Sequence, residues 1–107
     1  MRRSCEEGRT RLMLGGELDS YSSHLLERRM RQEEGEICSK LVLDLSDLEF
    51  VDSSGLRTLI EAAKRASAGG WRLDVVNARG RVRQVFDITD MDSLLEYCQR
   101  PPERAPR

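Results

Sequence analysis

The sequence lacks the long apolar runs and the paired cysteines that mark membrane and secreted proteins. No stretch of its 107 residues approaches the roughly 20 apolar residues of a membrane span, and its first residues lack a signal-peptide pattern. Cys5, Cys38 and Cys98 are widely spaced and include no CxxC pair, so they predict reduced thiols rather than a disulfide framework or a zinc site. We therefore expect a cytoplasmic protein without a membrane partner.

An excess of charge of one sign is also missing, because 18 basic residues face 19 acidic ones and the net charge is −1. Non-specific binding to nucleic acid needs a surplus of cations that displaces counterions from phosphates, so we expect no nucleic-acid partner. With 38% hydrophobic and 35% charged residues, the composition predicts one small globular domain over residues 1–98. Residues 99–107 are rich in Pro and Arg and are expected to form a disordered tail.

The motifs of common enzyme classes are absent from the sequence. It has no Gly-x-x-x-x-Gly-Lys-Ser/Thr phosphate loop, no GxGxxG after a strand, no Gly-x-Ser-x-Gly elbow and no metal-ligand cluster. A hydrolase built on Ser53 would need a base, and His24 is the only histidine. His24 stands in an early helical stretch, where a surface or half-buried helix residue is the simpler interpretation. We therefore expect neither catalysis nor a cofactor.

Strand and helix patterns alternate along the chain, which predicts an α/β fold with a mainly parallel or mixed sheet. Leu41–Leu45 is nearly continuous in apolar residues, as in a central strand covered on both faces. After Gly55, apolar residues recur at i, i+3, i+4 and i+7, which predicts an amphipathic helix that ends at Gly69-Gly70. Further expected elements are a strand over 10–14, a helix from about residue 20 to Glu34 before Gly35, a strand over 71–76, a short helix around Val82–Phe86 and an edge strand over 94–98.

The polar residues that follow the expected central strand form the best candidate site. In an open α/β sheet, binding sites gather at the carboxyl ends of strands, beside helix N-termini. If Ser53 caps the helix, its hydroxyl lies where backbone N–H groups and the helix dipole favour negative charge. A phosphate there would add roughly 1.5 to 2 negative charges beside Asp52 and Asp19 and leave the core intact, as a switch requires. The pattern alone favours a simpler interpretation, in which Ser53 or Asp52 is an ordinary helix cap and Asp44 a polar residue near a strand end.

Three segments, in order and spacing, resemble the STAS domain of bacterial anti-sigma factor antagonists: Gly16–Asp19 (GELD), Leu41–Leu56 (LVLDLSDLEFVDSSGL) and Arg79–Met91 (RGRVRQVFDITDM). The resemblance extends from about residue 10 to residue 98. It implies a mixed, mostly parallel sheet of four to five strands packed with about three helices. The chain has little before Thr10, and its Pro/Arg tail replaces the family's last helix, so we expect the C-terminal helix to be shortened or absent. A homodimer or a partner would then cover the apolar surface left open.

The resemblance also implies a function for the central motif. It implies that Ser53, the first serine of Asp-Ser-Ser-Gly-Leu, accepts a phosphate from a cognate anti-sigma factor, a serine kinase of the histidine-kinase-like ATPase fold. The unphosphorylated protein would bind this kinase and free a sigma factor, phosphorylation would end the binding, and a serine phosphatase would reset the switch. Arg57 stands where the family commonly has a small residue, and it would tune the choice of partner. The implied contact surface comprises Asp19, Asp52, Ser53, Ser54, Gly55, Leu56 and Arg57.

Two alternatives concern other small signalling domains. A receiver domain needs an acidic pair after its first strand and a lysine after a late strand, and neither Lys40 nor Lys64 is placed for that role. Within the resemblance, STAS domains also serve as non-phosphorylated adaptors in lipid-transport or stress-signalling complexes. Binding of a purified anti-sigma kinase would favour the switch, whereas co-purification with a membrane transport ATPase would favour the adaptor.

Overall fold

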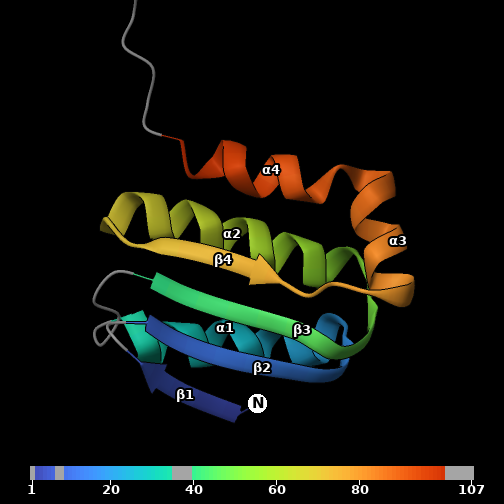
Figure 1. The fold of residues 1–107 in the computed structure, drawn as a ribbon, viewed down its shortest axis with the longest axis horizontal. Helices are drawn as coiled ribbons and strands as arrows, with labels where there is room; N and C mark the ends of the chain where they lie inside the picture. Colours follow the sequence, from blue (N-terminus) through green and yellow to red (C-terminus); the bar gives the residue numbers. More distant parts are fainter. Residues whose placement is uncertain (1, 7–8, 35–39, 101–107) are drawn as a thin grey trace, which may run out of the picture.

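The computed structural model describes residues 2–6, 9–34 and 40–100. In these residues, one four-stranded sheet with the order β1-β2-β3-β4 is packed with four helices (Figure 1). The expected helix stop at Gly35, the thiol of Cys38 and residues 101–107 of the tail expected over 99–107 lie outside the described residues. The elements are β1 (Arg2–Glu6), β2 (Arg9–Leu18), α1 (Ser20–Glu34), β3 (Lys40–Val51), α2 (Ser53–Gly69), β4 (Arg72–Val76), α3 (Gly80–Thr89) and α4 (Met91–Cys98).

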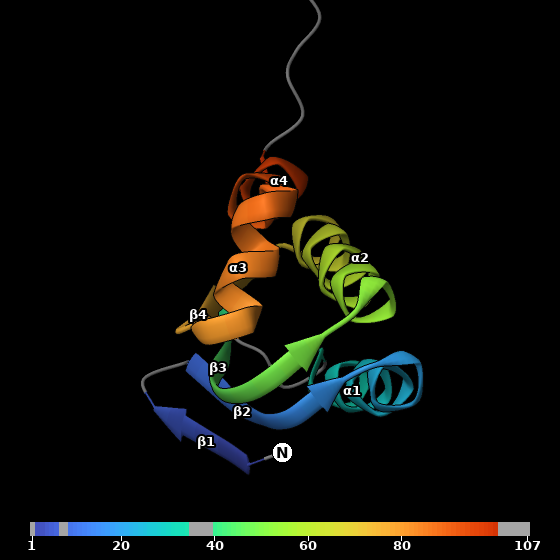
Figure 2. The ribbon, with the colours of Figure 1, turned by 90° about the vertical axis from the view of Figure 1, so that its right-hand side faces the viewer.

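The sheet is mixed and mostly parallel. β1 pairs antiparallel with β2, whereas β2, β3 and β4 run parallel to one another. Parallel neighbours need a crossover connection, and α1 and α2 supply the two crossovers. Both helices lie on the same side of the sheet, as Figure 2 shows, and α4 packs against α2. The prediction of an α/β fold with a mixed, mostly parallel sheet is confirmed.

The hydrophobic core lies between the sheet and the two crossover helices. From β3, Leu41, Leu43 and Leu45 point into the core and are fully buried. Val42 and Asp44 alternate with them and belong to the opposite face, which no helix of the described chain covers, so the expectation of a strand covered on both faces is wrong. The helix predicted after Gly55 is α2, and it turns its apolar stripe toward the same core. Its buried core residues are Leu59, Ala62, Ala63 and Ala66.

The opposite face of the sheet carries charged side chains, and no helix of the described chain covers it (Figures 1 and 2). Arg11 of β2 pairs with Asp44 of β3 at 2.5 Å. Lys40 of β3 pairs with Asp74 of β4 at 3.0 Å, and Arg72 reaches the same carboxylate at 2.9 Å. Cross-strand pairs of opposite charge suit a solvated face, and a register slip by one residue would bring these charges into the core. The charge pattern therefore fixes which face of the sheet is buried.

The last element is a helix, although the sequence predicts an edge strand over 94–98. That prediction was wrong, because a short apolar run fits either the strand or the helix period. Met91, Leu95 and Cys98 recur at i, i+4 and i+7 and pack on the core, and only a helix brings all three to one side. A C-terminal helix of eight residues is therefore present, and the alternative of its absence is excluded.

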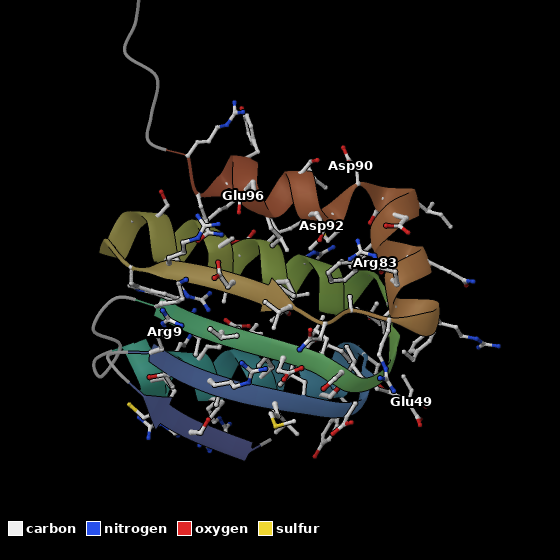
Figure 3. The ribbon with its side chains drawn as sticks, in the orientation of Figure 1. Arg9, Glu49, Arg83, Asp90, Asp92 and Glu96 are labelled. Carbon is white, nitrogen blue, oxygen red and sulfur yellow. The ribbon has the colours of Figure 1, made fainter. Side chains whose placement is uncertain are left out.

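The short helix predicted around Val82–Phe86 is α3, with both of these side chains buried. A charged contact sets the corner between α3 and α4. Arg83 pairs with Asp87 on its own helix at 3.0 Å and with Asp92 on α4, and Figure 3 shows Arg83 and Asp92 directed toward one another. The start of α3 lies beside the carboxyl end of β3.

The N-terminal part of the sheet is larger than the sequence predicts. Little apolar character precedes Thr10, yet Arg2–Glu6 pairs in continuous antiparallel register with β2. β2 also continues through Gly15 to Leu18, because two register shifts against β3 let it bend and keep pairing. The expectation of little structure before Thr10 is thus corrected. Backbone pairing at a sheet edge forms this strand, and such pairing leaves no apolar signature.

Candidate functional site

Two parallel strands and two helix N-termini meet at one end of the sheet. Leu18, the last residue of β2, pairs in register with Val51, the last residue of β3. α1 and α2 begin directly after these residues, so both N-termini lie side by side at the end that faces the viewer in Figure 2. The backbone N–H of Asp52 donates to the carbonyl oxygen of Leu18 at 3.1 Å, which joins the two strand-to-helix turns.

Asp19 closes the turn from β2 into α1. Its Oδ1 accepts from the backbone N–H groups of Tyr21, at 3.1 Å, and Ser22, at 3.0 Å. The Ser22 hydroxyl accepts in turn from the Asp19 N–H at 2.8 Å and donates to the carbonyl oxygen of Glu17 at 2.7 Å. The hydrogen bonds from Ser22 hold the pKa of Asp19 below its ordinary value, so its charge is retained at the start of the helix.

Asp52 caps α2, and Ser53 does not. The Asp52 carboxylate accepts from the backbone N–H of Gly55 at 3.1 Å, and its extended backbone lets its carbonyl oxygen accept from Leu56 N–H at 3.0 Å. The expectation that Ser53 supplies the cap is therefore wrong, and the alternative cap at Asp52 is confirmed. Both are good capping residues, but only the residue before the first helical position can occupy the cap, and Ser53 is that first position.

Gly55 is required by close packing at the junction. A Cβ atom at this position would lie 2.7 Å from the carbonyl oxygen of Leu18 and 2.7 Å from Cγ2 of Val51. The first turn of α2 therefore rests directly on the ends of β2 and β3. Glycine at the third position of the helix is the residue that permits this contact, which accounts for Gly55 in the Asp-Ser-Ser-Gly sequence.

The remaining residues of the predicted contact surface fall into two groups, half-buried and exposed. Leu56 is half-buried against the core, and Ser54 is half-buried with its carbonyl oxygen bound by the Thr58 hydroxyl at 3.0 Å. Ser53 and Arg57 are exposed. Within the described part of the chain, the Ser53 hydroxyl has no hydrogen bond and the Arg57 guanidinium has no ion pair. The seven predicted contact residues thus occupy one end of the molecule.

Asp44 lies apart from this group, on the charged face of the sheet. Its carboxylate accepts from the Ser46 N–H at 3.0 Å, from Arg11 at 2.5 Å and from the Asn77 amide at 3.1 Å. Burial acts to raise the pKa of Asp44, but these hydrogen bonds outweigh it and hold the pKa well below its ordinary value. Asp44 thus ties β2 and the turn after β4 to β3, which agrees with its interpretation as a structural residue near a strand end.

Exposed apolar and acidic side chains that are not among the predicted contact residues also lie at this end of the molecule. Tyr21 is 73% exposed and Leu25 is 43% exposed, both on the first turns of α1. Phe50 and Glu49 are exposed at the end of β3, where Figure 3 labels Glu49. The i, i+4 spacing of Tyr21 and Leu25, away from the buried Leu26, is the signal that would have revealed an exposed apolar edge on this helix.

A cavity of about 480 Å³ lies between the end of β3 and the start of α3, lined by Ser46, Asp47, Leu48, Glu49, Arg79, Gly80 and Arg81.

Across the described ranges, no group of three or more His, Cys, Asp or Glu side chains is arranged to hold a metal ion. No helix formed by those ranges is both long and apolar enough to cross a membrane.

Comparisons with known proteins agree with this architecture. The sequence profile of the STAS domain matches residues 5–102. The chain is 28% identical over 83 residues to an anti-sigma F factor antagonist of Paenibacillus polymyxa, covering 77% of this chain and 71% of that protein. It is 27% identical over 89 residues to an anti-sigma-B factor antagonist of Bacillus subtilis, covering 81% of this chain and 79% of that protein.

A solved structure gives the same result at the level of the fold. The crystal structure of an anti-sigma factor antagonist from Mycobacterium paratuberculosis superposes with a TM-score of 0.75 at 27% identity, covering 86% of this chain and 78% of that one. Profile, sequence relatives and fold thus agree. The chain belongs to the STAS domain family and is related there to anti-sigma factor antagonists.

Proposed function

We propose that this protein is an anti-sigma factor antagonist switched by phosphorylation of Ser53. In the unphosphorylated state it binds a cognate anti-sigma factor, a serine kinase of the histidine-kinase-like ATPase fold, and a sigma factor is released. Phosphorylation of Ser53 by that kinase ends the binding, and a serine phosphatase restores it. The exchange takes place in the cytoplasm. The relatives described above support the antagonist role, and the geometry around Ser53 supports the switch.

The observation that carries the proposal is that Asp52 caps α2 and Ser53 does not. The Asp52 carboxylate makes the cap contact with Gly55 N–H, so the fold does not need the exposed Ser53 hydroxyl. That hydroxyl is therefore free to meet a kinase. A phosphate attached to it would lie at a helix N-terminus, where the helix dipole favours negative charge.

The same position makes a phosphate effective as a signal. It would add roughly 1.5 to 2 negative charges to a surface that already carries the carboxylates of Asp19 and Asp52. A partner that fits the unmodified surface would then meet strong like-charge repulsion or an unpaired charge. The fold stays intact while the surface changes, so the partner is released without unfolding.

Phosphopeptide mapping of the protein isolated from its own cells, in growth and under stress, tests this proposal. We expect phosphate on Ser53, with an occupancy that changes with the condition. Absence of phosphate on Ser53 in every condition would overturn the switch and favour a constitutive adaptor.

Pull-down with tagged variants tests the direction of the switch. Ser53→Ala should retain an anti-sigma kinase constitutively, and Ser53→Asp should retain much less of it. Ser67→Ala is the matched control, because Ser67 is an exposed serine on the same helix and lies outside the predicted contact surface, and it should behave like the parent. Loss of the kinase with a folded Ser53→Ala protein, or capture of a membrane transport ATPase in its place, would contradict the proposal.

A further inference from the structure

Arg57 lies one helical turn beyond Ser53 on the same face of α2. Residues four apart on a helix have Cβ atoms about 5–6 Å apart, within reach of a long side chain. Both side chains are exposed, and neither has a hydrogen bond or an ion pair within the described part of the chain. The next acidic residue along this face, Glu61, has Lys64 at 3.6 Å as its ion-pair partner. Arg57 is therefore a cation with no ion-pair partner among the described residues, one helical turn from the hydroxyl that the proposed function modifies.

The strand-to-helix turns beside Ser53 carry carboxylates. The carboxylate of Asp52 precedes Ser53 and is held at Gly55 N–H, and Asp19 caps the adjacent helix. Asp47 and Glu49 are exposed at the end of β3, where they line a cavity together with Arg79 and Arg81. A dianionic phosphate placed among these carboxylates needs a compensating cation close by. On the first two turns of α2, from Ser53 to Ile60, Arg57 is the only basic residue.

We propose that Arg57 binds the phosphate of phosphorylated Ser53 and acts as an intramolecular clamp that stabilises the phosphorylated state. The proposal rests on the proposed function, because it specifies how the phosphate of that site is held. A guanidinium presents paired N–H donors that match two phosphate oxygens. The order, with the anion N-terminal to the cation at i, i+4, is the favourable one on a helix.

The clamp gives phosphorylation two effects on the partner surface. The modification adds negative charge at Ser53, and it also withdraws the guanidinium of Arg57 from any contact made in the unphosphorylated state. Release of the partner then combines repulsion with the loss of an existing contact. The clamp formed by Arg57 would therefore make release of the partner more complete.

The test is a titration of the phosphate in the full chain, with phosphoserine incorporated at position 53 during translation. A phosphoserine has its second pKa near 6, and a guanidinium about 6 Å away lowers that value by about 0.5. We expect ³¹P NMR to show a higher phosphate pKa in Arg57→Gln than in the parent, with most of the difference recovered in Arg57→Lys. Phosphorylation should also raise the melting temperature more in the parent than in Arg57→Gln.

Lys64→Gln is the matched control, since it removes one positive charge from an exposed position on the same helix, eleven residues beyond Ser53 and about 16 Å away along the helix axis. It should leave the phosphate pKa within about 0.1 of the parent, because exposed charges beyond a Debye length of about 8–10 Å are largely screened. An equal phosphate pKa in the parent and Arg57→Gln, or equal shifts in Arg57→Gln and Lys64→Gln, would overturn the clamp. The phosphate is installed without a kinase, so these outcomes test the clamp alone. Whether cells phosphorylate Ser53 is a separate question, and its answer decides the proposed function.

Discussion

The side-chain amide of Gln99 pairs with both backbone polar groups of Leu73. It donates to the Leu73 carbonyl oxygen at 2.9 Å and accepts from the Leu73 N–H at 2.8 Å. Leu73 lies in β4, an edge strand of the sheet, so the amide takes the place that a further strand would occupy. Because Gln99 follows directly on α4, this contact fastens the end of the last helix to the sheet.

Replacing Gln99 by alanine should loosen that attachment. Two hydrogen bonds are lost at a half-buried position, so we expect the free energy of unfolding to fall by about 2 kcal/mol. Urea denaturation followed by circular dichroism measures the loss. Gln84→Ala, an exposed change on α3, is the control and should stay within about 0.5 kcal/mol of the parent. Equal stability of the two variants would show that the Gln99 contact adds nothing.

Substitutions of Asp52 and Ser53 should differ in their effect on stability, because only Asp52 makes the cap contact at the start of α2. Asp52→Ala removes the carboxylate that binds Gly55 N–H and should cost about 1 kcal/mol of stability. Ser53→Ala removes an exposed hydroxyl that has no hydrogen bond to any described residue, and it should change stability by less than about 0.5 kcal/mol. Thermal unfolding of both variants measures the difference. A larger loss in Ser53→Ala would mean that the serine, as the sequence alone suggested, supplies the cap.

A methyl group at position 55 should disrupt the junction of strands and helix. The Cβ of Gly55→Ala would meet the Leu18 carbonyl oxygen and Val51 at 2.7 Å, so the first turn of α2 must move outward. We expect a loss of about 2 kcal/mol from this overpacking, measured by urea denaturation. At an ordinary helix position the same change stabilises a protein by about 1 kcal/mol, so a gain in stability would contradict the close contact.

Acid should weaken the fold partly through Asp44. The folded-state pKa of this carboxyl lies below its ordinary value of 3.8, so its contribution is complete above about pH 5 and is lost as the pH falls toward the folded pKa. Asp44→Asn removes the charge that Arg11 binds and should cost about 2 kcal/mol at pH 7. The difference in unfolding free energy between parent and variant should shrink between pH 5 and pH 3. A difference that is constant over this range would exclude a role for the ionised carboxylate.

The parts of the fold predicted correctly are those in which apolar residues recur with one clear period. β3 and α2 have long, unambiguous patterns, and both follow from burial against one core. β1 was missed because its residues RRSCE pair through the backbone and bury little apolar surface. α4 is predicted in the wrong class because residues 94–98 alone fit a strand or a helix, and only Met91, which lies before them, completes the helical stripe.

The candidate site shows the same limit at the scale of single residues. The sequence places Asp52, Ser53 and Gly55 together, but it does not say which side chain makes the cap, because that depends on where the helix begins. The reason for Gly55 is equally hidden, since the atoms that exclude a side chain belong to Leu18 and Val51. Contacts between segments far apart along the chain set both answers.

The contact of Gly55 with Leu18 has a consequence for any enzyme that modifies this turn. The Asp52 N–H is bound to Leu18, and the first turn of α2 rests on two strand ends. The segment around Ser53 can therefore become extended only if these contacts break. Such an enzyme must approach a folded epitope and leave it in place. We expect a linear peptide that spans Ser53 to be a poor acceptor, because recognition would then depend on the assembled domain and not on a short consensus sequence.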